Sequence, residues 1–261
     1  MGLGPQEPKI CVVTPYYKEG REWLERCLAS VSNQTVKADH IMVADGFPQL
    51  WLDEAGVRHV KLDRAHADYG DVARGLGALM AINEKYQAIA FLDADNCFAH
   101  DHIETCLAAA AANPNAPYVV ARRDLVRPDG SVLPITMSAD FPFGDHVDTN
   151  CYLFLPPAFS LLHYWVTIPK EFSIIGDRLF RIVMKSRLAA PAVAFKPTVK
   201  YTCLAEVYYK AAGEAPPEGA DKPNVNLGPA IEWLRMQLPE ELVVIDELSG
   251  MALSRLASAA A

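Results

Sequence analysis

In the first half of the chain, short runs rich in β-branched residues alternate with longer segments that have the periodicity of amphipathic helices. The apolar runs are too short for helices, whereas the segments between them repeat apolar residues at i, i+3, i+4 and i+7. The predicted strands are 9–16, 40–44, 57–62, 88–92 and 118–122, and the predicted helices are 19–33, 71–87 and 101–113. In helix 71–87 the residues expected to face the core are Val72, Leu76, Leu79 and Tyr86. Strands joined through helices form right-handed crossovers, so this order predicts an α/β fold whose mainly parallel sheet has helices on both faces.

The alternation ends near residue 122, and the second half of the chain is less regular. A turn signal at 127–130 predicts a hairpin, and helical periodicity resumes over 176–187. The uncharged stretch 151–169 approaches the length of a bilayer crossing, but Pro156 and Pro157 interrupt it. We therefore expect a buried strand, a break and a short helix there, with peripheral membrane contact as the alternative.

Shifts in composition divide the chain into four segments. Residues 1–125 are expected to form the first half of one domain and 126–212 its second half. The Pro- and Gly-rich segment 213–229 predicts a flexible loop or linker, and 230–261 predicts a C-terminal helical extension. Such an extension can cover the core or pair two chains into a homo-oligomer, and the local sequence favours neither.

Charge and composition exclude several classes of protein. The 261 residues include 24 Lys and Arg against 32 Asp and Glu, a net charge of −8, and 51% of them are hydrophobic. This apolar content excludes a mainly disordered chain, and the acidic balance argues against nucleic-acid binding, which requires a basic surface. The six cysteines are scattered, and the first residues lack the pattern of a secretory signal. We therefore expect a cytoplasmic protein without a transmembrane segment.

Polar or turn-forming residues follow three of the predicted strands. These residues are TPYY at 14–17, DG at 45–46 and DADN at 93–96. The carboxyl ends of parallel strands meet at one edge of a sheet, which is where open α/β sheets bind ligands. The three segments are therefore expected to line one crevice.

The pair Asp93 and Asp95 is the candidate metal site in this crevice. Mg²⁺ and Mn²⁺ prefer oxygen ligands and commonly bind one or two carboxylates together with substrate phosphates. In the alternative interpretation, one carboxylate caps the following helix and the other is solvated. Two known motifs fit less well, because an EF-hand requires glycine where Phe98 stands, and haloacid-dehalogenase-type phosphatases require Thr or Val where Cys97 stands.

Arg74 is expected in the first turn of helix 71–87. There its guanidinium and the free backbone N–H groups can meet a diphosphate, although a place on the solvated face of the helix explains it equally well. The neighbouring Gly75 and Gly77 do not make a dinucleotide-binding fingerprint, because Met80 stands in place of the third glycine.

Four segments, in this order and spacing, resemble the nucleotide-sugar-binding half of GT-A-fold glycosyltransferases, most closely the inverting family 2: VVTPYYKEG, VADG, HADYGDVARGLGA and AFLDADN. The resemblance covers 9–125 well and 126–205 loosely. It implies a GT-A-like sheet and a donor site made of Thr14, Pro15, Tyr16, Glu19, Asp45, Gly70, Arg74, Asp93 and Ala94.

Within that site the resemblance implies particular roles. Asp45 contacts the base or ribose, Asp93 contacts the ribose, and Arg74 reaches the diphosphate. Asp95 binds Mn²⁺ or Mg²⁺, which bridges the diphosphate and stabilises its charge as the glycosidic bond breaks.

The resemblance also implies a general base for the acceptor hydroxyl, which the family commonly takes from an acidic residue at the start of a later helix. Asp177 in the segment SIIGDR matches this position, and its alternative role is a helix cap. Asp148 is the reserve candidate, followed by Asp145.

The function expected from the resemblance is transfer of a sugar, with inversion, from a nucleoside diphosphate donor to a saccharide or another hydroxyl acceptor. A UDP-sugar is the first expectation for the donor, on family frequency alone. The alternatives are a non-catalytic nucleotide-sugar-binding protein of the same fold and a sugar-phosphate nucleotidyltransferase. The latter would need a Gly-rich loop after the first strand, which this chain lacks.

Overall fold

The computed structural model describes residues 8–135, 147–221 and 225–258. Within them the chain forms an eight-stranded sheet with the strand order β3-β2-β1-β4-β7-β6-β8-β5. The strands are β1 (Ile10–Tyr16), β2 (Asp39–Ala44), β3 (Arg58–Lys61), β4 (Ala88–Phe91), β5 (Cys97–Phe98), β6 (Tyr118–Val126), β7 (Tyr152–Phe154) and β8 (Ala192–Thr202). The α-helices are α1 (Arg21–Ser32), α2 (Asp71–Asn83), α3 (His102–Ala112), α4 (Tyr164–Thr167), α5 (Gly176–Arg187), α6 (Glu206–Ala212), α7 (Gly228–Arg235), α8 (Pro239–Ser249) and α9 (Ser254–Ser258).

The direction of the strands confirms the mainly parallel α/β sheet that the sequence predicts. β3, β2, β1 and β4 are parallel neighbours, β7 is antiparallel to both β4 and β6, and β8 is parallel to β6. The chain leaves β1 on one side toward β2 and β3 and returns to β4 on the other side. The carboxyl ends of β1 and β4 therefore flank a topological switch point, the usual place for a ligand in such a sheet.

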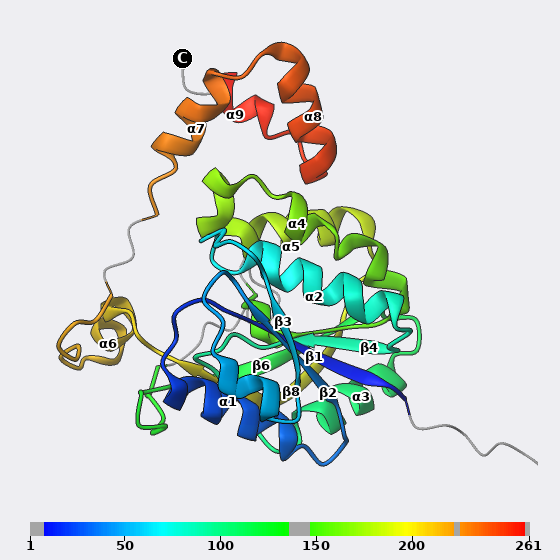
Figure 1. Cartoon of the computed structure of the whole chain (residues 1–261), viewed down its shortest axis with the longest axis vertical. Helices are drawn as coiled ribbons and strands as arrows, with labels where there is room; N and C mark the ends of the chain where they lie inside the picture. The colour runs from blue at the N-terminus through cyan, green and yellow to red at the C-terminus, as the bar shows by residue number, and fades with distance from the viewer. Residues whose placement is uncertain (1–7, 136–146, 222–224, 259–261) are drawn as a thin grey trace, which may run out of the picture.

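Helices cover both faces of this sheet (Figure 1). α2 lies against β1 and β2, with α4 above it, whereas α3 lies against β6 and β8 on the opposite face, where α1 is also found. The C-terminal helices α7, α8 and α9 form a cluster beyond α4 and α5, and Leu234 and Leu253 join this cluster to the main core. None of the helices in the described segments has the length and apolar character that a membrane crossing requires.

The less regular second half also follows the sequence-based expectations. Val126 and Val132 pair in an antiparallel bridge, so the predicted hairpin is present. The uncharged stretch contains β7, then a 3₁₀-helix at Pro156–Leu161, and then α4. Helix α5 has the predicted start and end.

Helix α2 ends at Asn83, before the predicted residue 87, and it is buried mainly on a different face from the predicted one, although Tyr86 beyond its end is buried as expected. Leu79, expected in the core, is 37% exposed, and the buried positions of the helix are mainly Ala and Gly. A Cβ atom on Gly77 would overlap Val13 of β1, and a Cβ on Gly75 would lie 2.5 Å from Cγ2 of Val166. α2 therefore packs closely between the sheet and α4 through its small residues. Larger residues such as Leu79 lie on the more exposed side of the helix. The spacing of large apolar residues does not reveal such packing on two sides.

We expect Gly75→Ala to lower the free energy of unfolding by about 1–3 kcal/mol, because the new methyl group overlaps Val166 and Trp165. In an unconstrained helix the same change would stabilise by about 1 kcal/mol. The control is Asn83→Ala at the exposed C-terminal end of the same helix, expected to stay within about 0.5 kcal/mol of the wild type. Urea denaturation measures both, and a Gly75→Ala variant as stable as the wild type would contradict the close packing of α2 against α4.

Candidate functional site

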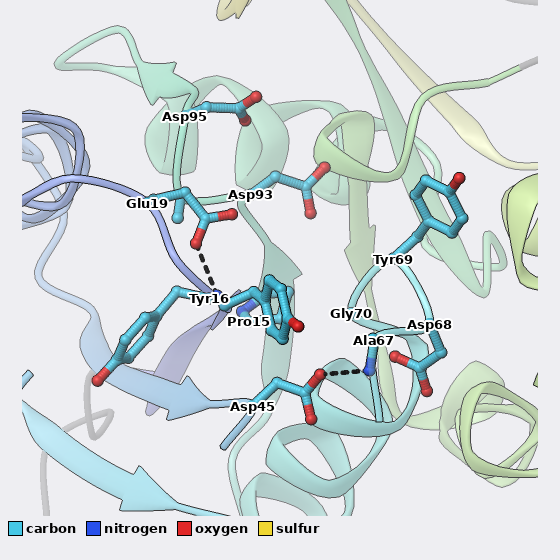
Figure 2. A pocket seen from close by; sticks show the side chains of 12 residues that line it. Pro15, Tyr16, Glu19, Asp45, Ala67, Asp68, Tyr69, Gly70, Asp93 and Asp95 are labelled. Carbon is cyan, nitrogen blue, oxygen red and sulfur yellow. Dashed lines mark hydrogen bonds between the residues drawn. The ribbon is translucent and has the colours of Figure 1, made fainter. Parts of the chain in front are cut away.

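A cavity of about 450 Å³ opens at the carboxyl ends of β1, β2 and β4 (Figure 2). We call it the first cavity. Its walls are formed by Pro15, Tyr16, Tyr17, Glu19, Asp45, Ala67, Asp68, Tyr69, Gly70, Asp93, Ala94 and Asp95. The three strand ends that the sequence analysis singles out therefore do meet at one place.

Most of the residues assigned to the donor site by the resemblance lie in these walls: Pro15, Tyr16, Glu19, Asp45, Gly70, Asp93 and Ala94, together with the metal candidate Asp95. Figure 2 shows Glu19 and Asp95 on one side of the cavity and Tyr69 across from Glu19. The structure brings these residues together but does not by itself assign their roles.

Thr14 differs from this group, because its side chain lies in the core and not in the cavity. Its hydroxyl is 2.8 Å from Nε2 of His40 and 3.7 Å from Sγ of Cys27. Burial lowers the pKa of His40 to about 3, so the imidazole is neutral. Successive residues of a strand point to opposite faces, which separates Thr14 from Pro15.

Asp45 holds the segment that precedes α2. Its Oδ1 accepts hydrogen bonds from the backbone N and from Nδ1 of His66, both at 2.8 Å, and its Oδ2 accepts one from the backbone N of Ala67 at 2.8 Å. Ala67, Tyr69 and Gly70 all have positive φ angles, of 51°, 56° and 82°. Asp45 thus fixes a strained segment that forms one wall of the cavity, a role that the sequence analysis did not predict.

A second cavity, of about 260 Å³, adjoins the first and shares Tyr69, Asp93 and Asp95 with it. Both candidate bases, Asp177 and Asp148, lie in its walls. The third candidate, Asp145, lies outside the described residues. The two cavities therefore meet at the aspartates that follow β4.

A chain of five polar side chains crosses the junction of the two cavities. Nη2 of Arg74 donates to Oδ1 of Asp93 at 2.7 Å, and Nδ2 of Asn150 donates to Oδ2 of Asp93 at 2.9 Å. Asn150 also donates from Nδ2 to Oδ1 of Asp148 at 2.6 Å, and Asp148 accepts from Nη1 of Arg123 at 2.6 Å. We call this chain the polar network. Asn150 and Arg123 were not predicted from the sequence, because neither belongs to a recognisable motif.

Arg74 takes a more buried place than the resemblance implies. It is 3% exposed, its guanidinium lies 4.7 Å from the ring centroid of Trp165, and Nη1 is 3.3 Å from Oδ1 of Asp71. Both terminal nitrogens thus face carboxylates, while the buried Nε has no hydrogen-bond partner among the described residues.

The two candidate bases differ in their exposure, although each accepts a hydrogen bond from a backbone N. Asp148 is 8% exposed, and its oxygens accept hydrogen bonds from Arg123 and Asn150. Asp177 lies in the first turn of α5 and is partly exposed in the wall of the second cavity. An acceptor hydroxyl can approach Asp177 more readily than Asp148.

The residues of the first cavity fit a divalent cation that the substrate helps to bind. Five lining residues carry carboxylates (Glu19, Asp45, Asp68, Asp93 and Asp95), and none is lysine or arginine. Burial and the charges of Asp93 and Glu19 raise the pKa of Asp95 to about 7, and Asp95 forms no ion pair within the described segments. Those segments hold no group of three or more His, Cys, Asp or Glu side chains arranged to bind a metal unaided. One carboxylate completed by phosphate oxygens is a normal arrangement for Mg²⁺.

Asp71 is a buried carboxyl group at the start of α2, and it lies against the start of α5. Burial, opposed by Arg74 and reinforced by Asp68, raises the pKa of Asp71 to about 8. Its Oδ2 has no hydrogen-bond partner among the described residues, and a Cβ on Gly176 would lie 2.5 Å from that oxygen. The start of α5 therefore approaches Asp71 this closely only because residue 176 is glycine.

The raised pKa of Asp71 has a measurable consequence for stability. The folded chain keeps this proton while the unfolded chain loses it between about pH 4 and pH 8, so the contribution of Asp71 to stability is greatest below pH 4 and falls as the pH rises to 8. Asp71→Asn keeps the shape and removes the charge. We expect the stability of the variant relative to the wild type to rise by a few kcal/mol between pH 5 and pH 9, because one pH unit between the unfolded and folded pKa values is worth about 1.4 kcal/mol.

Urea denaturation at pH 5, 7 and 9 tests this prediction, with the exposed Asp63→Asn as control. The control should follow the wild type at each pH. A constant difference between Asp71→Asn and the wild type across the three pH values would show that Asp71 is ionised throughout.

Comparison with known proteins gives the family of the chain. Residues 11–143, just over half of the chain, match the sequence model described as glycosyl transferase family 2, so the chain belongs to this family of glycosyltransferases. No curated protein matches the chain by sequence.

Solved structures of TarS from S. aureus have a similar fold. TarS 1–349 in complex with UDP is 15% identical, with a TM-score of 0.59 over 97% of this chain and 72% of that one. The complex with UDP-GlcNAc is 13% identical, with a TM-score of 0.57 over 96% and 73%. A longer TarS structure is 14% identical, with a TM-score of 0.56, and this chain spans 38% of its length. At this identity the likeness shows the fold, which is GT-A-like.

Proposed function

We propose that the chain transfers a sugar, with inversion, from a UDP-sugar to an acceptor hydroxyl, assisted by a divalent cation. The observation that carries the proposal is that the two cavities meet at Asp93 and Asp95. The first cavity lies at the strand ends, and the second is lined by Asp177. Family membership supports sugar transfer, and the TarS structures with UDP and UDP-GlcNAc support uridine as the nucleoside.

The charge of the first cavity supports the need for a cation. A diphosphate brought among five carboxylates, with no basic residue in the walls, is repelled unless a positive ion accompanies it. Asp95 would hold Mg²⁺ or Mn²⁺, which supplies positive charge where the diphosphate leaves. Asp93 is already engaged by Arg74 and Asn150, and it fixes the strand end beside Asp95.

The second cavity supports an inverting transfer. We assign Asp177 as the general base that takes the proton of the acceptor hydroxyl while its oxygen bonds to the anomeric carbon of the sugar. The bond from that carbon to the diphosphate breaks at the same time, and its electron pair leaves with UDP. Asp148 is already paired with Arg123 and stabilises the wall of the second cavity.

Thermal unfolding with UDP, GDP, CDP and ADP, each with and without Mn²⁺, tests donor binding. A ligand at 100 times its dissociation constant stabilises by about 2.7 kcal/mol, roughly 5–10 °C for a chain of this size. We expect a shift with UDP that requires Mn²⁺. Donor binding without turnover on any acceptor would favour a non-catalytic binding protein, and release of pyrophosphate from a nucleoside triphosphate would favour a nucleotidyltransferase.

Asp95→Asn is expected to abolish the Mn²⁺-dependent part of the UDP shift, because the amide is a weak ligand for a hard cation. The melting temperature without ligand should not fall, because the substitution removes a buried like charge from beside Asp93. Glu22→Gln on the exposed side of α1 serves as control. An undiminished Mn²⁺ dependence in Asp95→Asn would overturn the metal assignment.

Asp177→Asn is expected to lower kcat for sugar transfer by about 10²–10⁴-fold, because it removes the base but leaves the first cavity intact. The dissociation constant for UDP should change less than twofold. Glu171→Gln, an exposed acid on the 3₁₀-helix Lys170–Ile175 just before α5, is the control. Full activity of Asp177→Asn would contradict the base assignment.

A further inference from the structure

Tyr69 lies at the junction of the two cavities, and the residue is 71% exposed. The other residues that both cavities share are Asp93 and Asp95. Figure 2 shows the ring of Tyr69 at the edge of the first cavity, across from Glu19. Tyr69 is therefore the aromatic residue that faces both the donor and the acceptor side.

The backbone at Tyr69 is held in a conformation that a tyrosine rarely adopts. Its φ of 56° lies in the left-handed region, which is unfavourable for a residue with a Cβ atom. On one side Ala67 is bound through its backbone N to Asp45. On the other side Gly70 lies so close to Pro15 that a Cβ there would be 3.0 Å from the proline Cβ.

The start of α2 constrains the same segment. Oδ2 of Asp68 accepts a hydrogen bond from the backbone N of Val72 at 3.1 Å, and the backbone O of Gly70 accepts one from the N of Arg74 at 2.8 Å. Tyr69 lies between these fixed points, so its ring is presented from a rigid backbone and not from a mobile loop.

Folding gains little from this arrangement. Among the described residues, the Tyr69 side chain makes no hydrogen bond and no stacking contact with another ring. A smaller or polar residue would serve the fold as well, and glycine would relieve the backbone strain. Strain that persists without a gain in stability points to function.

We propose that the ring of Tyr69 is the platform on which the transferred sugar packs. This inference rests on the proposed function, in which the diphosphate lies near Asp95. The group that follows the diphosphate then lies at the junction of the cavities, beside Tyr69. A sugar ring has an apolar face of C–H groups, which packs against an aromatic ring, while its hydroxyls can donate to the carboxylates around it.

The test compares the binding of UDP with that of UDP-sugars. Calorimetry with Mn²⁺ gives dissociation constants for UDP and for UDP-Glc, UDP-Gal and UDP-GlcNAc, and the tightest of the three sugars is taken forward. In Tyr69→Ala we expect the affinity for that UDP-sugar to fall about 3- to 10-fold, the usual effect of one aromatic contact, with UDP unchanged. Tyr69→Phe keeps the ring and should bind both like the wild type.

The outcomes separate the two levels of the proposal. If Tyr69→Ala binds UDP and the UDP-sugar as the wild type does, or loses both equally, the platform is overturned and the proposed function stands. If the wild type binds neither UDP nor any UDP-sugar, the proposed function fails, and the role of Tyr69 fails with it.

A stability measurement tests the backbone part of the argument independently of any ligand. Glycine adopts positive φ freely, so Tyr69→Gly should melt about 2–4 °C above Tyr69→Ala. Equal melting temperatures would overturn the claim that Tyr69 is held under strain.

Discussion

The ion pair between the buried Arg74 and the partly exposed Asp93 is the interaction on which the site depends. It joins the first turn of α2 to the segment after β4, next to the switch point between β1 and β4. Asn150 and then Asp148 extend the polar network to the segment before β7. Removing one member of a buried pair leaves an uncompensated charge, which is far more destabilising than removing an exposed pair. The network therefore gives the junction of the two cavities its rigidity.

The same network accounts for the acidic walls of the first cavity. Arg74 and Arg123 are paired with Asp93 and Asp148, and the first cavity has no basic side chain in its walls. A chain that binds an anionic donor in such a place needs positive charge from outside the protein. In the proposed function, the arginines fix the polar network, Asp95 binds the cation, and Tyr69 presents an apolar surface to the sugar.

Much of this arrangement could be predicted from the sequence, because strands and their ends are set by local patterns. Asp45 and Asp93 were found because each directly follows an apolar run, and Asp95 because it stands two residues after Asp93. The partners of these residues were not, since Asn150 reaches Asp93 across 57 residues of sequence, a pairing that only the fold creates. The buried face of α2 was predicted wrongly because its contacts are made by glycine and alanine, and the strained backbone at Tyr69 arises from anchors on Asp45 and Pro15 that no local motif reveals.

The most direct test of this account is a crystal structure of the chain with UDP and Mn²⁺. The account predicts uridine along the ends of β1 and β2, Mn²⁺ between Asp95 and the diphosphate, and Arg74 still paired with Asp93. A diphosphate bound to Arg74, with Asp93 displaced and no cation at Asp95, would contradict it. In that case the arginine would be the anion receptor, and the polar network would be a feature of the empty enzyme alone.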